Sequence, residues 1–452
     1  MNILLIGNGF DLAHGLPTKY TDFLEFVKMI KIIKEKNIFN DGFAISDAGC
    51  NVDNGKLHQD IRLTILNKAN NNKLEGDSKE LIDCINHNIW IEYFLQCDSF
   101  LKENWIDFES EISRIIKIID NDIHKNGGLN AVVRSISEDF LANYFLDNLD
   151  ERIQKRRDEL FKKYENIPVG EQSRYVEQYE EAHPILPLKE EITYGDLIRI
   201  LEDDLNKLIR ALEIYICEYV EKIDIIEKSP DIDKEEIDFI LSFNYTHIFS
   251  KLYSVSSQSK KEVADPFDYL HGEAKINNTV ETNNMVLGID EYLPEERKNT
   301  EIEFIDFKKF YQRIFKGTGC KYKKWLEIIK KDYLEYIQRQ IDTDSKRYIL
   351  DKMQATMHYY AMQAIKRQSL KKHNLYIFGH SLDVTDKDIL RDLILNDNVY
   401  TTIYYPDKKE LGRKIANLVK VIGQDELIRR TGGSTKTIEF KLQQPMVSIY
   451  KL

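Results

Sequence analysis

Polar side chains that could bind or process a small molecule follow three short apolar runs, at the point where each run ends. Asn244 follows the run that begins at Phe239, His271 follows Tyr269–Leu270, and a Gly-His-Ser turn follows Leu375–Phe378. Imidazole, amide and hydroxyl groups are the kinds that convergent ligand sites use. In an open α/β sheet the carboxyl ends of the strands line the ligand crevice, so these groups are expected to converge there.

A fourth candidate is the glycine turn Gly7–Asp11, which follows the apolar run Ile3–Ile6. Two glycines at the end of a buried strand let the backbone turn sharply and let a phosphate approach main-chain N–H groups. Leu12 stands where the usual dinucleotide fingerprint has its third glycine. Asp11 has two interpretations: its carboxylate caps the following helix, which is favoured, or it lies where a phosphate would bind.

Each later group also has a purely structural interpretation. Asn244 suits a turn with left-handed geometry, His271 taken alone is more often a structural histidine, and Ser381 with Asp383 suits the cap of a helix near Thr385. If there were no site, all four groups would have to be purely structural, so a shared site is favoured. The candidate site residues are His271, Asn244, Gly7, Asn8, Gly9, Phe10, Asp11, Gly379, His380, Ser381 and Asp383.

Six apolar runs have the length of strands and are apolar on both parities, which is typical of strands buried on both faces. Helical periodicity fills most of the chain between them and predicts a parallel sheet flanked by helices. The runs are Ile3–Ile6, Phe239–Phe243, Tyr269–Leu270, Met285–Ile289, Leu375–Phe378 and Thr402–Tyr405; the helical stretches are 78–97, 104–121, 129–165 and 194–228, with loops over 40–76 and 166–192.

The uneven spacing of these runs predicts a sheet domain interrupted by helices. The first strand and its helix end near residue 33, and the next convincing strand begins only near residue 238. We expect a discontinuous core over 1–35 and 236–425, a helical insertion over 78–235, a second helical block over 307–370 within the core, and a C-terminal extension over 426–452.

The bulk composition excludes several classes of protein. The formal net charge of −12 argues against general, sequence-independent DNA binding, which needs a basic face. Five cysteines without a C-x-x-C pair favour reduced thiols in a cytoplasmic protein. The N-terminus lacks the basic and long apolar regions of a signal peptide, and no apolar run reaches the length of a membrane span.

Two further charged segments are candidate sites. The segment 307–333 concentrates nine Lys and Arg residues among aromatic residues, which suits either a nucleic-acid surface or, more often, an amphipathic helix pair with a solvated lysine face. Asp107 and Glu109 are two residues apart on one expected helix and do not share a face. No metal site is therefore predicted there.

Five segments resemble the AbiH family of bacterial anti-phage proteins and span nearly the whole chain. They are ILLIGNGFDLAHGLPTKYTDFL, NWIDFESEI, LSFNYTHIF, LHGE and FGHSLDVTDKDIL. The same landmarks are similar, in order, to those of the sirtuin fold: Phe243–Thr246 to its Q-N-I-D segment, Leu270–Gly272 to its His-Gly and Gly379–Leu382 to its G-T-S-L. The resemblance implies a Rossmann-like, sirtuin-like, mostly parallel sheet flanked by helices, with large helical insertions.

The sirtuin likeness further implies that the site binds NAD or a related nucleotide. His271 would then act as the base and Asn244 would hold the water or ribose, a role that suits a neutral imidazole near pH 7. The four zinc cysteines of deacetylase sirtuins are missing, so no zinc is expected and NAD hydrolysis fits better than deacetylation. Asp11 and Thr246 depart from the NAD-binding pattern and leave the identity of the nucleotide open. Phosphate or ribose binding is assigned to Gly7, Gly9, Ser381 and Asp383.

Three hypotheses follow from the sequence. The first is a phage-triggered effector that hydrolyses NAD or a related nucleotide. The second is a metal-dependent nuclease that uses the basic segment 307–333 with Asp383 and Asp386. The third is a nucleotide-sensing protein without catalysis. A phage-derived trigger is an expected partner and a membrane is not, while homo-oligomerisation stays open.

Overall fold

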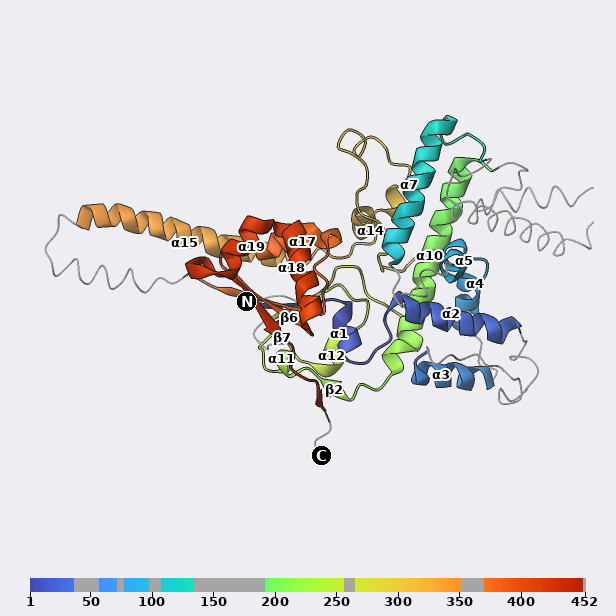
Figure 1. Cartoon of the computed structure of the whole chain (residues 1–452), viewed down its shortest axis with the longest axis horizontal. Coiled ribbons are helices and arrows are strands. Elements are labelled where there is room, and N and C mark those ends of the chain that lie inside the picture. The colour runs from blue at the N-terminus through green and yellow to red at the C-terminus, as the bar shows by residue number, and fades with distance from the viewer. Residues whose placement is uncertain are drawn as a thin grey trace, which may run out of the picture. The chain divides into compact units, whose positions relative to one another are not determined.

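The computed structural model divides the chain into two compact units, each of which is described by itself (Figure 1). Unit 1 comprises Met1–Leu16, Asp224–Gly272 and Gly317–Leu452, and unit 2 comprises Pro17–Ile223 and Glu273–Lys316. The residues that the structure describes are 1–35, 57–70, 77–96, 107–133, 192–255, 265–350 and 370–449.

Unit 1 is built on a six-stranded sheet in which every neighbouring pair of strands is parallel. The order across the sheet is β4-β3-β1-β5-β6-β7. Numbered by their sequence within this sheet, the strands run 3-2-1-4-5-6, so the direction of winding reverses between β1 and β5. The strands are β1 (Asn2–Ile6), β3 (Phe239–Ser242), β4 (Phe267–Tyr269), β5 (His373–Phe378), β6 (Val399–Tyr405) and β7 (Ile438–Leu442).

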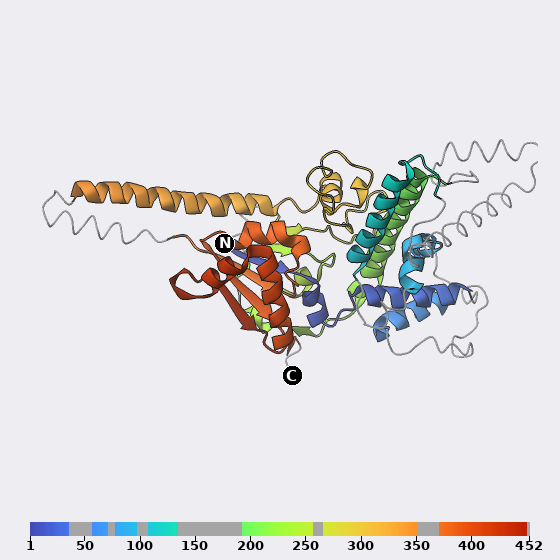
Figure 2. The same ribbon diagram turned by 45° about the horizontal axis from the view of Figure 1, so that its top comes forward.

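Helices cover both faces of this sheet, which explains why its strands are apolar on both parities. On one face Ile3 and Leu5 of β1 share a core with Trp325 and other side chains of α15, α17 and α18. On the other face Phe10 of α1 packs against an aromatic ring set that includes Phe249 of α12. These helices are α1 (Asn8–Ala13), α12 (Ile248–Leu252), α15 (Tyr322–Leu350), α17 (Lys387–Ile394) and α18 (Lys408–Ile422). Figure 2 shows the red helices of the C-terminal region packed against the strands.

Five of the six predicted strands are confirmed, and the prediction of a strand over Met285–Ile289 is wrong. That run is buried in unit 2, where Ile289 makes only an isolated bridge to Lys308. The side-chain amide of Gln312 accepts from the Leu287 N–H at 3.1 Å and donates to the Leu287 carbonyl at 3.1 Å. A side chain thus satisfies backbone groups that a neighbouring strand satisfies in a sheet, and the periodicity of the run could not reveal this.

Unit 2 is helical, with an aromatic core. Phe94 and Phe108 stack with ring centroids 4.2 Å apart, and Phe23 and Phe26 pack against Tyr215. The helices are α2 (Tyr20–Glu35), α3 (Gln59–Asn70), α4 (Asp77–Ile85), α5 (Ile89–Gln96), α7 (Phe108–Asn126), α10 (Tyr194–Glu218) and α14 (Lys309–Phe315).

The helical predictions differ from the structure in two places. The expected helix 78–97 is two helices, separated where His87 adopts a positive φ of 54°. The expected loop 40–76 contains α3. The expected helix 129–165 lies almost wholly outside the described residues. Within the expected C-terminal extension, residues 438–442 form β7, the edge strand beside β6.

Candidate functional site

The turn after β1 packs backbone against backbone on the turn after β5. The Gly7 N–H donates to the Phe378 carbonyl at 3.2 Å, and the Gly9 N–H donates to the Gly379 carbonyl at 2.8 Å. A Cβ at Gly7 would lie 2.8 Å from the His380 Cα, and a Cβ at Gly9 would lie 2.8 Å from the Gly379 Cα. The glycines are therefore needed for the close approach of two turns, and both N–H groups are bonded to protein carbonyls.

Asp11 does not cap the following helix, contrary to the favoured prediction. It lies within α1, whose N-cap is Gly7, and its buried carboxylate accepts a hydrogen bond from the Thr246 hydroxyl at 2.8 Å. Asp11 therefore joins α1 to the segment after β3.

Asn244 is buried beside the glycine turn. Its side-chain Nδ2 donates to the Gly7 carbonyl at 3.1 Å, and its N–H donates to the Ser242 hydroxyl at 3.1 Å. Its φ is not positive, so the interpretation as a left-handed turn residue is wrong. The amide at the end of β3 and the turn at the end of β1 thus meet, as the sequence predicts.

His271, at the end of β4, faces a carboxylate that also faces a second imidazole. The Asp386 Oδ1 lies 3.7 Å from the His271 Nε2, and the Asp386 Oδ2 lies 3.3 Å from the His380 Nε2. All three side chains are buried, with 8% or less of each residue exposed. The Phe243 ring contacts both imidazoles edge-on, at centroid distances of 5.4 and 4.3 Å. This His–Asp–His group joins the ends of β4 and β5.

A hydrogen bond from the backbone determines which ring nitrogen of neutral His380 carries the proton. Its Nδ1 accepts from the Leu382 N–H at 2.9 Å, so in the neutral ring the proton is on Nε2, which faces Asp386. Leu382 holds a positive φ of 60°, a conformation that a non-glycine residue keeps only where its surroundings impose it. The turn after β5 therefore holds the imidazole in one tautomer and one orientation.

Asp383 acts as a cap, as its structural interpretation predicts. Its carboxylate accepts from the Thr385 N–H at 3.2 Å and starts the short helix η4 (Val384–Asp386). That turn places Asp386 directly before α17, and the Asp386 carboxylate makes no capping bond of its own. Asp386 can thus be directed at the two histidines.

The group has the chemistry of a general base held by a carboxylate. An opposite charge within about 4–6 Å favours the protonated form of an imidazole. His271 can accept a proton while Asp386 stabilises the resulting charge and His380 holds Asp386 in place. Unit 1 therefore brings together a candidate base, a buried amide and two tight turns at the carboxyl ends of β1, β3, β4 and β5.

The family model described as bacteriophage abortive infection AbiH matches residues 3–405. The chain belongs to the AbiH family. No curated protein and no solved structure matches this AbiH chain. The match begins in β1 and ends at the last residue of β6, so it includes every predicted site residue and stops before α18.

The other predicted ligand residues of this AbiH chain do not share one environment: some are exposed and one is buried. Asn8 is exposed, and Phe10 is buried in the aromatic face of the sheet. Ser381 is exposed, and its carbonyl accepts from the Asn417 side chain at 3.0 Å.

Lys414 contacts this turn and is not among the predicted site residues. Asp386 is predicted only as a metal-binding residue of the nuclease alternative, and the structure instead places it between two histidines. No sequence motif indicates Lys414.

The basic segment 307–333 is divided between the units after Lys316. In unit 1 the Trp325 side chain is buried while Lys323 and Lys324 are exposed, the pattern of an amphipathic helix. Several of the cations are paired with carboxylates: Lys308 with Glu291 at 3.0 Å, Lys309 with Glu109 at 2.6 Å, Lys323 with Asp392 at 2.9 Å, and Lys321 with Asp265.

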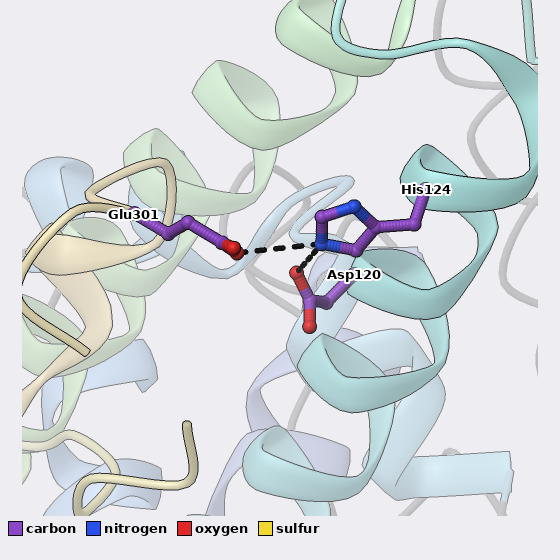
Figure 3. Close-up of side chains that lie close together, drawn as sticks. All are labelled: Asp120, His124 and Glu301. Atoms are coloured by element: carbon purple, nitrogen blue, oxygen red, sulfur yellow. Dashed lines mark ion pairs between the residues drawn. The ribbon is translucent and has the colours of Figure 1, made fainter. Parts of the chain in front are cut away.

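A separate cluster in unit 2 brings Asp120, His124 and Glu301 together, with donor atoms within 4.8 Å of one another (Figure 3). The Arg297 guanidinium bonds both Asp120 oxygens at 3.0 Å and also contacts Glu301 and the His124 Nε2. A guanidinium is always a cation, so it supplies the positive charge that these carboxylates need. We describe the cluster as an ion-pair network.

Among the described residues, no helix combines the length and the apolar character that crossing a bilayer requires.

Proposed function

We propose that this AbiH-family chain binds NAD or a related nucleotide at the strand ends of unit 1 and hydrolyses its N-glycosidic bond, which arrests phage-infected cells. Family membership indicates the role in abortive infection. The observation that carries the enzymatic proposal is the buried His271–Asp386–His380 group beside Asn244 and the glycine turn. A solely structural histidine does not require a shared carboxylate and a second oriented imidazole.

The strand order supports a Rossmann-like, sirtuin-like core. The order 3-2-1-4-5-6 is that of doubly wound dinucleotide-binding sheets, which bind their ligand where the winding reverses. Here the reversal lies between β1 and β5, whose turns carry Gly7 and His380. A nucleotide at this position meets the candidate base.

The proposed reaction replaces the nicotinamide–ribose bond with a water-derived hydroxyl. Water attacks the anomeric carbon of the ribose, the C–N bond breaks with its electron pair on nicotinamide, and His271 accepts the proton that the water loses. The transition state carries positive charge on the sugar, so positioning of water and electrostatic stabilisation are the main requirements. Asn244 positions the water or the ribose, and Asp386 stabilises the protonated His271. The expected location of this reaction is the cytoplasm.

The test is incubation of the purified chain with NAD, with and without a lysate of phage-infected cells, followed by chromatography for nicotinamide. The proposal predicts nicotinamide and ADP-ribose in equal amounts. A parallel incubation with labelled RNA and DNA plus Mg²⁺ or Mn²⁺ tests the nuclease alternative. Metal-dependent cleavage of nucleic acid without nicotinamide release contradicts the proposal, and ligand-induced stabilisation without any product supports the sensor alternative.

Asp386→Asn is expected to lower kcat by about tenfold to a hundredfold, less than loss of the base itself, because the amide cannot stabilise a protonated His271. Steady-state nicotinamide release measures the loss. Asp388→Asn is the matched control, since Asp388 is exposed two residues away. Equal kinetics in both variants would remove Asp386 from the mechanism.

A further inference from the structure

The sheet of unit 1 ends at β7, which has a partner strand on one edge only among the described residues (Figure 1). On the paired edge the Thr401 N–H of β6 donates to the Thr437 carbonyl at 2.7 Å. The Gln443 N–H donates to the Tyr405 carbonyl at 2.9 Å. Along a strand, residues whose backbone groups bond one neighbour alternate with residues whose groups point the other way. The N–H and carbonyl groups that point to the open edge are therefore those of Ile438, Phe440 and Leu442.

This open edge lacks two common features that keep edge strands from pairing with another chain, which are proline and β-bulges. The strand contains no proline, and its register with β6 runs without a bulge from Ile438 to Leu442. Two exposed charged residues, Glu439 and Lys441, lie between the open-edge residues. Charged side chains also restrict pairing at an edge, so their arrangement decides which strand can be added.

The two charges of β7 are complementary to those of a second copy of β7. Antiparallel pairing about a two-fold axis at Phe440 sets Glu439 of each copy opposite Lys441 of the other. Opposite charges at facing positions of neighbouring strands attract, whereas like charges repel. Moving the axis by one residue sets Glu439 opposite Glu439 or Lys441 opposite Lys441. The charge pattern therefore favours one register, and within its own chain Glu439 makes a long ion pair of 3.8 Å with Lys436.

The same register matches the backbone and the apolar side chains of the open edge. Phe440 lies opposite Phe440 and Ile438 lies opposite Leu442, so each N–H and carbonyl of the edge gains a partner. Leu442 is 57% exposed, whereas Ile438 is 1% exposed and shares a core with α18 and α19 (Gln424–Thr431). The added strand extends that core across the axis. Further apolar side chains are exposed on these two helices: Ile415, Val419 and Ile428.

We propose that β7 is the interface of a homodimer, in which two copies of this chain pair antiparallel through their open β7 edges with the axis at Phe440. The two sheets then form one continuous sheet, and both copies use the same surface, as a two-fold axis requires. The proposal goes beyond the proposed function, because β7 carries none of the candidate site residues. The family match ends at residue 405, so the interface lies in residues that the family model does not cover.

Sedimentation velocity of the full chain over a range of concentrations tests this interface. The wild type should form a dimer that dissociates on dilution. Lys441→Glu sets two carboxylates opposite each other on both sides of the axis and should raise the dissociation constant about tenfold. Adding Glu439→Lys to the same chain restores opposite charges and should return the constant to about the wild-type value. Lys125→Glu, an exposed lysine of unit 2, is the control and should dissociate as the wild type does.

The charged residues of β7 are exposed, so these variants should keep the circular dichroism spectrum of the wild type, which separates lost pairing from lost folding. The interface is wrong if the wild type is monomeric at every concentration or if Lys441→Glu dimerises as tightly as the wild type. It is also wrong if the double exchange fails to restore the dimer.

Disulfide trapping locates the axis. In the proposed pairing the two Phe440 Cα atoms lie about 5.5 Å apart, a separation that a disulfide can span. Phe440→Cys should therefore give a covalent dimer under mild oxidation. Leu442→Cys should not, because its two copies lie more than about 10 Å apart along the strands. No trapping of Phe440→Cys, or equal trapping of both variants, contradicts the register.

Discussion

His271→Ala is expected to reduce nicotinamide release by about 10²–10⁴-fold, the range that a positioned general base contributes. The imidazole at the end of β4 is the candidate proton acceptor, and alanine removes one of the two imidazoles that face Asp386. The truncation removes no backbone bond of the sheet. Initial rates at saturating NAD, together with the melting temperature, measure the loss of activity and the integrity of the fold.

His124→Ala is the control for that experiment. His124 lies in unit 2, its side chain is 51% exposed, and it belongs to the Arg297 network, which has no part in the proposed reaction. Its kcat should match that of the wild type. Full activity in His271→Ala would contradict the assignment of the base, and equal losses in both variants would point to a general defect.

Gly379→Ala should destabilise unit 1 by roughly 3–5 kcal/mol, at the severe end for single substitutions. Gly379 has a φ of +73°, where an L side chain is strained, and a Cβ there would overlap the Phe10 backbone nitrogen. Backbone atoms of α1 cannot rotate away as a flexible side chain can. The turns after β1 and β5 would have to separate and lose the bond between Gly9 and Gly379. Urea unfolding followed by circular dichroism gives the free energy of unfolding.

Gly412→Ala provides the matched comparison in the same unit. Gly412 lies inside α18, and a Cβ there meets nothing within 4 Å. Alanine has the higher helix propensity, so this variant should gain about 0.5–1 kcal/mol. If Gly379→Ala unfolds at the wild-type urea concentration, the two turns are not packed as described, and the geometry proposed for the site is wrong.

The sequence predicts the sheet and the meeting of Asn244 with the glycine turn because both depend on local patterns. Apolar runs such as Ile3–Ile6 and Leu375–Phe378 are buried on both faces, so their pattern is visible without tertiary information. Polar groups directly after such runs must lie at the carboxyl edge of a parallel sheet, which is why Asn244 and Gly7 were expected to meet. Their 3.1 Å hydrogen bond confirms that expectation.

What the sequence does not reveal depends on contacts between distant segments. Lys414 reaches the His380 carbonyl from a helix that follows another strand, and no local motif indicates this contact. Asp11 follows the usual pattern of a helix cap, yet the helix begins earlier, at Asn8, and the carboxylate bonds Thr246. The run Met285–Ile289 has strand composition, but a glutamine side chain takes the place of a partner strand.

The most direct test of the central claim is mass spectrometry of nucleotide pools in bacterial cells that express the chain, before and after phage infection. We expect NAD to fall and both ADP-ribose and nicotinamide to rise after infection of cells with the wild-type chain, and the NAD pool to stay level with His271→Ala. Arrest of infected cells while NAD stays level in the wild type would contradict it.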